Sequence, residues 1–139
     1  MIPVYQTMTV ANDGEGNCFN ACVASIMERP LRDVATIYPK FDGDYWGAWR
    51  DWFTSQGLKL VWHRHLSSPP KGYAIASGMG GRYYPEDHDL AGMEIGHAAV
   101  VFNGSLVHDP FPGATQFDRI DKYWTIEILE PRNEADATA

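Results

Sequence analysis

The spacing of hydrophobic residues changes midway along the chain, from helical intervals to strand intervals. Residues 18–28, CFNACVASIME, are apolar on nearly every side, which predicts a helix buried in the interior with Asn17 as its cap. Pro30 ends this helix and favours a second, short helix that runs through Ile37 and is closed by Pro39. The N-terminal part is therefore expected to be helical.

A third helix is predicted over residues 44–56. Trp46, Trp49 and Phe53 recur there at three- and four-residue intervals, which is typical of an amphipathic helix. Gly57 follows and is suited to a left-handed stop.

The second half of the chain predicts strands. Period-two patterns or short apolar runs are separated there by Gly and Pro, and they lie at 58–65, 72–77, 97–102, 105–110 and 123–129. Residues 78–96 are expected to form a long loop, which is typical of functional or mobile segments. Helices followed by strands indicate an α+β fold.

Length and composition fit one folded domain. The chain has 139 residues, 45% of them hydrophobic and 21% charged, which is typical of a globular protein. We expect a single domain over residues 1–130 and a frayed, small and polar tail over residues 131–139.

Net charge limits the classes of binding partner, and the N-terminus and hydropathy of the chain indicate its cellular location. A net charge of −7 with only 11 Lys and Arg argues against a nucleic-acid partner. The N-terminus lacks the features of a targeting signal, and no apolar run of about 18 residues predicts a membrane span. We expect a cytoplasmic protein whose two cysteines are thiols, because an i, i+4 pair on one helix is poorly arranged for a disulfide.

Cys18 is the candidate nucleophile. It stands at the first turn of the predicted buried helix, where the positive helix end favours the thiolate. Gly14 and Gly16 leave the approach to that helix end open, so a substrate carbonyl can reach the sulfur. Cys22, one turn later, is interpreted as a core residue.

A histidine and an aspartate on a predicted hairpin supply candidate partners for the thiol. His97 begins one strand and Asp109 ends the next. A two-residue turn at 103–104 would point Asp109 to the opposite side of the sheet from His97. A three-residue loop at 102–104, with Gly104 as a left-handed bulge, would set His97 directly opposite Asp109. We predict the second register.

The order of these motifs resembles the papain-like cysteine peptidases, in particular the C39-like group that includes the bacteriocin-leader peptidases, of bacterial or phage type. The matching segments are GNCFNACVASIM (16–27), GHAAVVF (96–102) and VHDPFPG (107–113). The resemblance implies an N-terminal helical half that carries Cys18, packed on a C-terminal antiparallel sheet that carries His97 and Asp109. It also implies an active site in the cleft between the two halves.

The family places a glutamine upstream of the cysteine, usually six positions before it, to donate a hydrogen bond to the oxyanion. Asn12 has this spacing but a shorter amide, whereas Gln6 has the residue type at twice the distance. We favour Gln6, because ANDGEG (11–16) is able to act as a loop insertion. Family members often have Asp where this chain has Asn17.

The implied reaction is acyl transfer without a cofactor or metal. His97 takes the Cys18 proton, Cys18 attacks an amide or isopeptide carbonyl of a peptide or protein substrate, and water resolves the thioester. Asp109 orients the imidazolium. Two alternatives stay open: a deamidase or transglutaminase-like enzyme on the same scaffold, and a non-catalytic peptide-binding module. The sequence leaves the oligomeric state undetermined.

Other chemistry-bearing residues receive structural interpretations. His63 and His65 lack the spacing of a zinc site with the two cysteines. His88 and His108 are expected at solvated positions. The tryptophans at 46, 49, 52 and 62 are expected in the core, with one or two available to line a cleft. Residues 82–84, Arg-Tyr-Tyr, either contact a peptide or form an exposed loop.

Overall fold

The computed structural model describes residues 1–13, 15–38, 43–64, 68–111 and 117–129. Its helices are α1 (Val10–Asp13), α2 (Cys18–Met27) and α3 (Tyr45–Ser55), with a short 3-10 helix, η1 (Leu31–Asp33). The strands are β1 (Leu58–Arg64), β2 (Tyr73–Tyr83), β3 (Glu94–Phe102), β4 (Ser105–His108) and β5 (Arg119–Ile128). The predicted α+β class is therefore confirmed.

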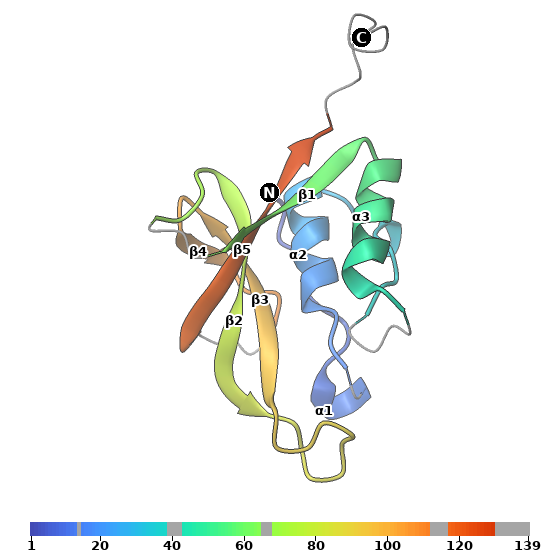
Figure 1. Ribbon diagram of the computed structural model, residues 1–139, viewed down its shortest axis with the longest axis vertical. Coiled ribbons are helices and arrows are strands. Elements are labelled where there is room, and N and C mark those ends of the chain that lie inside the picture. The colour runs from blue at the N-terminus through green and yellow to red at the C-terminus, as the bar shows by residue number, and fades with distance from the viewer. Residues whose placement is uncertain (14, 39–42, 65–67, 112–116, 130–139) are drawn as a thin grey trace, which may run out of the picture.

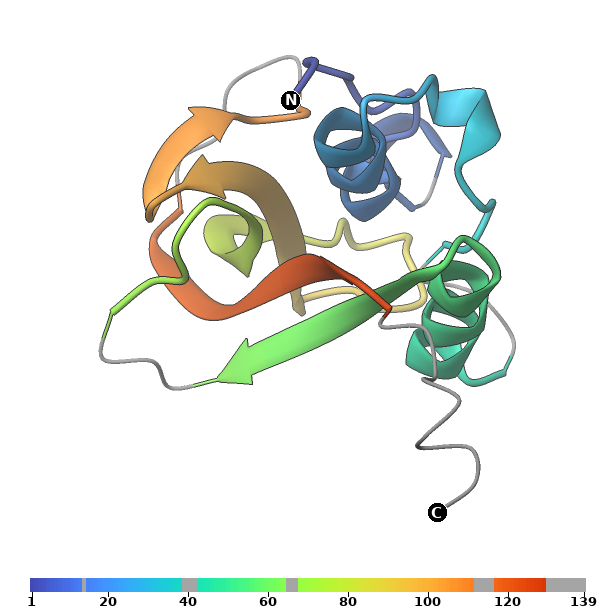
Figure 2. The ribbon, with the colours of Figure 1, turned by 90° about the horizontal axis from the view of Figure 1, so that it is seen from above.

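The five strands form one antiparallel sheet in the order β1-β5-β2-β3-β4. The helices gather on one side of this sheet (Figures 1 and 2). In this arrangement α2 packs against β2 and β3, and α3 packs against β1. The first turn of α2 is thereby held close to the start of β3.

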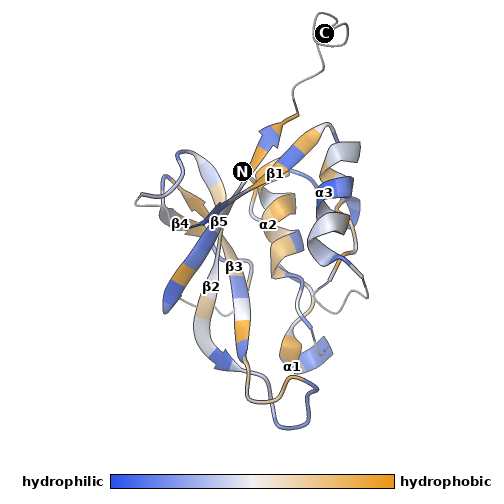
Figure 3. Ribbon diagram, viewed as in Figure 1, coloured by the Kyte–Doolittle hydropathy of each residue, from blue (hydrophilic) through white to orange (hydrophobic). Residues whose placement is uncertain are grey.

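Helix α2 is the central element of the core. Seven of its ten residues are buried, and Figure 3 shows it as mostly hydrophobic along its length. Its side chains join those of α3 and the sheet in a single cluster whose largest members include Trp49, Phe53 and Ile75. Burial of such side chains contributes about 1.5–3 kcal/mol each. This packing fixes the position of α2 relative to the strands.

Helix α3 matches its prediction. Asp44 lies at its N-terminal cap position, and its side chain accepts a hydrogen bond of 3.0 Å from the Gly47 N–H. Gly57, just beyond the helix, has a φ of 73°, the left-handed conformation expected for it.

Two predicted elements differ from the structure. The short helix after Pro30 is only the single 3-10 turn η1, because Val34 already has an extended backbone. The long loop predicted over 78–96 is partly strand, since β2 continues to Tyr83 and β3 starts at Glu94. A register shift between Met79 and Tyr83 interrupts the β2–β3 pairing. Gly81 lies in this stretch with a φ of 76°, and a β-bulge accommodates a glycine in that conformation.

The N-terminal segment is tied to the body of the fold by hydrogen bonds. Ile2 N–H donates to Ser25 O, and Gln6 N–H donates to Pro110 O. His108 Nε2 donates to Val4 O at 2.7 Å, and His108 is only 6% exposed, so the expectation of a solvated position for it is wrong.

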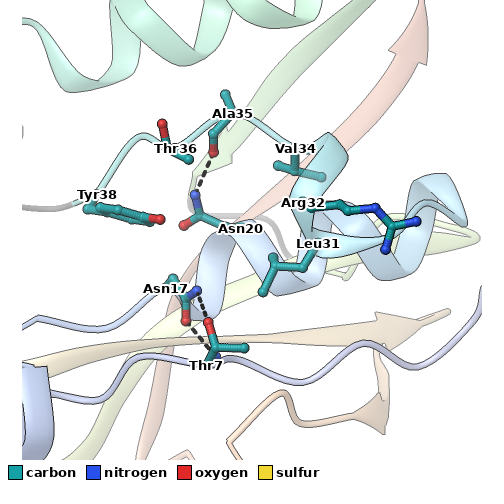
Figure 4. Close-up of a pocket in the computed structure, with 9 residues that line it drawn as sticks. All are labelled: Thr7, Asn17, Asn20, Leu31, Arg32, Val34, Ala35, Thr36 and Tyr38. Carbon is teal, nitrogen blue, oxygen red and sulfur yellow. Dashed lines mark hydrogen bonds between the residues drawn. The ribbon is translucent and has the colours of Figure 1, made fainter.

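Asn17 was predicted to cap α2, and this is wrong. Its side chain makes no capping hydrogen bond. Instead its Oδ1 accepts from the N–H groups of Thr7 and Met8, and its Nδ2 donates to Thr7 Oγ1, each at 3.0 Å. Figure 4 shows Asn17 bonded to Thr7. An amide both accepts and donates, which lets Asn17 hold the N-terminal segment beside α2.

None of the helices in the described part of the chain is both long enough and apolar enough to cross a membrane.

Candidate active site

His97 and Asp109 form a buried pair. His97 Nε2 lies 2.8 Å from Asp109 Oδ1, and the two side chains are 1% and 8% exposed. The same carboxylate oxygen accepts the Phe111 N–H at 2.9 Å, which fixes its orientation. An ionised carboxylate only accepts, so His97 donates from Nε2, and Nδ1 is the ring nitrogen left for other chemistry.

The hairpin that carries this pair does not have the predicted register. Asn103 and Gly104, with φ values of 50° and 85°, form a two-residue turn, and Phe102 pairs with Ser105. Positive φ at both positions is typical of a type I′ turn. The predicted three-residue loop is therefore wrong, and this turn alone would point Asp109 away from His97.

A register shift in β4 restores the contact. Between Val101 and Val100 the pairing slips by one residue, so that Val100 faces His108. A one-residue shift turns every following side chain to the other face of the sheet. Asp109 therefore shares a face with His97 and reaches it diagonally across the two strands rather than from directly opposite.

Cys18 is the first residue of α2 and lies beside His97. Both residues line one pocket of about 260 Å³, together with Phe19, Tyr45, Trp46, Ser77 and Ala98, and we call it the aromatic pocket. Cys18 is partly exposed, in contrast to Cys22. The first N–H groups of a helix have no partner within the helix, and the Asn17 side chain leaves them uncapped. The positive end of α2 thus faces the thiol and the pocket.

Electrostatics favour a protonated His97. Burial by itself lowers its pKa, but hydrogen bonds to Asp109 and Cys18 and the charges of both groups outweigh burial and raise the pKa from 6.5 to about 9. His97 therefore holds its proton at neutral pH. The pKa of Cys22 is raised well above 9.0, first by burial and then by the charges of Cys18 and Asp109. Cys22 is a neutral core thiol, as predicted.

Gln6 lies beside the thiol, whereas Asn12 does not. Gln6, Cys18 and His97 line a second, smaller pocket of about 50 Å³, which also contains Arg82 and Phe111, and we call it the Arg82 pocket. The Gln6 Nε2 donates to Met8 O at 2.9 Å, which leaves its second N–H hydrogen for another acceptor. Asn12 is exposed on α1.

Arg82 and Tyr84 are the site residues that sequence reasoning left unresolved. Arg82 Nη2 lies 3.5 Å from His97 Nδ1. Tyr84 lines both pockets, and its pKa is raised by burial and by the charges of Cys18 and Glu15. Tyr83, between them, is 61% exposed. Residues 82–84 run from the end of β2 into the segment after it, and the side-chain alternation of extended backbone would have indicated this pattern.

A third pocket contains none of these reactive groups. It has a volume of about 330 Å³ and contains no Cys or His (Figure 4). Asn20 lines both this pocket and the aromatic pocket, and its Nδ2 donates to Ala35 O and Ile37 O. We assign the site by its reactive groups rather than by volume, because a nucleophile beside a positioned base is the stronger sign of chemistry.

The remaining candidate residues have structural positions. His63 Nε2 lies 2.8 Å from Thr125 Oγ1, and His65 and Gly14 lie outside the described residues. No group of three or more His, Cys, Asp or Glu among the described residues is arranged to hold a metal ion. Trp49 is in the core as predicted, whereas Trp46 lines the aromatic pocket and stacks on Trp124 at 4.3 Å.

Compared with models of known protein families, with curated proteins and with solved structures, the chain matches none of them.

Proposed function

We propose that this chain is a papain-like cysteine peptidase that cleaves peptide or isopeptide bonds through Cys18, His97 and Asp109. The observation that supports the proposal most directly is the 2.8 Å pair of His97 and Asp109 beside a thiol at the first turn of a buried helix. A thiolate next to an imidazolium is the reactive form of such a pair, and the raised pKa of His97 favours that imidazolium.

The reaction proceeds in two balanced steps. The Cys18 sulfur attacks the carbonyl carbon, and the C–N bond breaks as His97 passes its Nδ1 proton to the departing nitrogen. A water molecule then attacks the thioester and gives a proton to His97, and the S–C bond breaks to release the acid. Asp109 keeps its proton-free state throughout and orients the ring.

The oxyanion of both steps would be held by two donors. The uncapped Cys18 N–H at the start of α2 is one, and the second Gln6 Nε2 hydrogen is the other. Gly16, which lines both pockets, lacks a side chain that would narrow the approach. The aromatic pocket is the larger of the two pockets beside the thiol and would receive the acyl part of the substrate.

A thiol-directed probe tests the proposal without knowledge of the substrate. Iodoacetamide should label Cys18 at least 100-fold faster than Cys22 near neutral pH, because thiolate content and access control thiol reactivity. His97→Ala should lower the rate at Cys18 towards that of an unactivated thiol such as glutathione, whereas Cys22 stays slow in both proteins because it is buried. Equal labelling of the two cysteines, or a Cys18 rate unchanged by His97→Ala, would contradict a His-activated nucleophile.

A screen of peptide and isopeptide conjugates then tests turnover. Wild-type protein should release product from at least one conjugate, and Cys18→Ala should release none. Product analysis by mass spectrometry separates hydrolysis from deamidation or transfer to an amine. Turnover that persists in Cys18→Ala would overturn the proposal.

A further inference from the structure

Arg82 places a cation beside the proposed nucleophile. Its Nη2 lies 3.5 Å from His97 Nδ1, and its guanidinium stacks over the Phe111 ring at 4.6 Å. Arg82, near the end of β2, lines the Arg82 pocket together with Ile95 and His97 of β3. The guanidinium therefore projects into the Arg82 pocket.

The described residues provide no carboxylate for this guanidinium. Arg82 takes part in none of the ion pairs among the described residues, and its Nε is buried without a hydrogen-bond partner there. The chain has 18 acidic against 11 basic residues, so a partly buried Arg without an ion pair among the described residues is unexpected on composition. The Arg guanidinium has five N–H donors, and two of them can bind a carboxylate through a pair of parallel hydrogen bonds.

The charge of His97 makes an anion more favourable at this point. With a pKa of about 9, His97 is a cation at neutral pH, and its Nδ1 side faces Arg82. Two facing cations repel; the proposed Cys18 thiolate offsets part of this cost at His97, and an anion bound beside Arg82 would offset more of it. Asp109 contacts the opposite ring nitrogen, Nε2, so its carboxylate does not fill this position.

We propose that Arg82 binds the α-carboxylate of a one-residue leaving group, so that the substrates are peptides from which a single C-terminal amino acid departs through its α-nitrogen. The inference rests on the proposed function, because Nδ1 of His97 must protonate the departing nitrogen. In an amino acid this nitrogen lies about 2.5 Å from the carboxylate carbon. Arg82 and His97, 3.5 Å apart, are spaced to contact both groups together.

The size of the Arg82 pocket supports a short leaving group. Its volume of about 50 Å³ is far below the 260 Å³ of the aromatic pocket, which lies against the same thiol. A leaving group of two residues would move its carboxylate a further ~3.5 Å from His97, beyond the reach of Arg82 in its present position. Arg82 would thus act on specificity, by binding the end of the substrate.

A pair of alkylating agents tests the carboxylate site directly. Iodoacetate and iodoacetamide differ mainly in a carboxylate against an amide, and the ratio of their rates with glutathione corrects for intrinsic reactivity. For Cys18 the corrected ratio should favour iodoacetate by about 10-fold or more, the effect of a charge-assisted contact. Mass spectrometry assigns the labelled cysteine.

Variants connect this preference to Arg82. Arg82→Gln should abolish the preference, so that the corrected ratio for Cys18 falls to the ratio for glutathione, and circular dichroism of the variant checks that it is folded. Arg82→Lys should keep part of the preference. Arg64→Gln removes an equal charge on exposed β1 and should leave the ratio unchanged. A wild-type ratio equal to that of glutathione, or a preference that survives in Arg82→Gln, overturns the inference.

Three peptides with the same acyl part identify the source of the carboxylate. One ends in a free carboxylate one residue after the scissile bond, the second has the same residue amidated, and the third has an internal Glu there. Cleavage of the first at least 10-fold faster than both others is expected. Equal rates for the first two, or fastest cleavage of the third, overturn the α-carboxylate assignment. Lack of cleavage with an intact iodoacetate preference would count against the proposed function and leave the anion site standing.

Discussion

Cys18 and Cys22 lie one turn apart on α2, yet the fold gives them opposite environments. Cys18 lines two pockets and faces His97, whereas Cys22 is 0% exposed in the main core. A cysteine side chain is therefore a candidate nucleophile at position 18 and a buried core residue one turn later, at position 22. The difference arises because the first turn of α2 lies beside His97 of β3, whereas the next turn packs in the hydrophobic core.

The largest expected effect is that of Cys18→Ala. Removal of the nucleophile should lower the rate of peptide cleavage by about 10⁴-fold or more, because the thioester cannot form. Progress curves with a substrate from the conjugate screen provide the measurement. A residual rate within 10-fold of wild type would remove the functional contrast between the two cysteines.

Asp109→Asn should have the next largest effect, a loss of about 10³-fold in kcat, since the amide cannot hold the imidazolium in place. The pKa of His97 should fall from about 9 towards or below 6.5, because burial then acts with less opposition. NMR titration of the His97 ring measures this shift. An unchanged titration midpoint would show that Asp109 is not the dominant partner.

The same shift determines a pH dependence of stability. The folded-state pKa of His97 is raised, so its stabilising effect is complete below pH 6.5 and is lost as the pH rises through about 9. The free energy of unfolding of wild type should therefore exceed that of Asp109→Asn by an amount that shrinks between these values. Urea unfolding at several pH values tests this, and a difference that grows with pH would contradict it.

Substitution of Gln6, with Asn12 as the matched control, should have a smaller effect on kcat. Gln6→Ala should lower kcat by about 10²-fold if its amide holds the oxyanion. Asn12→Ala should change kcat less than 2-fold, because Asn12 is exposed on α1. Steady-state kinetics on both variants decide between them. Similar losses in both would contradict the assignment of Gln6.

The smallest kinetic effect is expected for Cys22→Ala. This variant should keep cleavage within about 2-fold of wild type and lose about 1–2 kcal/mol of stability, as for a small deletion in a packed core. Thermal unfolding and the cleavage assay provide the two readouts. A large loss of cleavage with little loss of stability would reverse the roles of the two cysteines.

Sequence reasoning located the parts of the site better than their arrangement. The spacing of Trp46, Trp49 and Phe53 predicted α3, and the chain order of a cysteine, a histidine and an aspartate singled out Cys18, His97 and Asp109. The β3–β4 turn was predicted incorrectly, because the choice between a two- and a three-residue loop depends on a later shift in β4 that leaves no separate signal in the chain.

The sequence by itself determined the α+β class and the apolar character of α2 and supplied the candidate site residues, because hydrophobic periodicity and residue chemistry are local properties. Only the tertiary structure decided that Asp109 reaches His97, that Asn17 binds the N-terminal segment, and that Arg82 enters the site. These contacts join segments that are far apart in the chain, and the distance along the chain does not show which way their side chains point. Strand register and side-chain facing are set by the whole sheet.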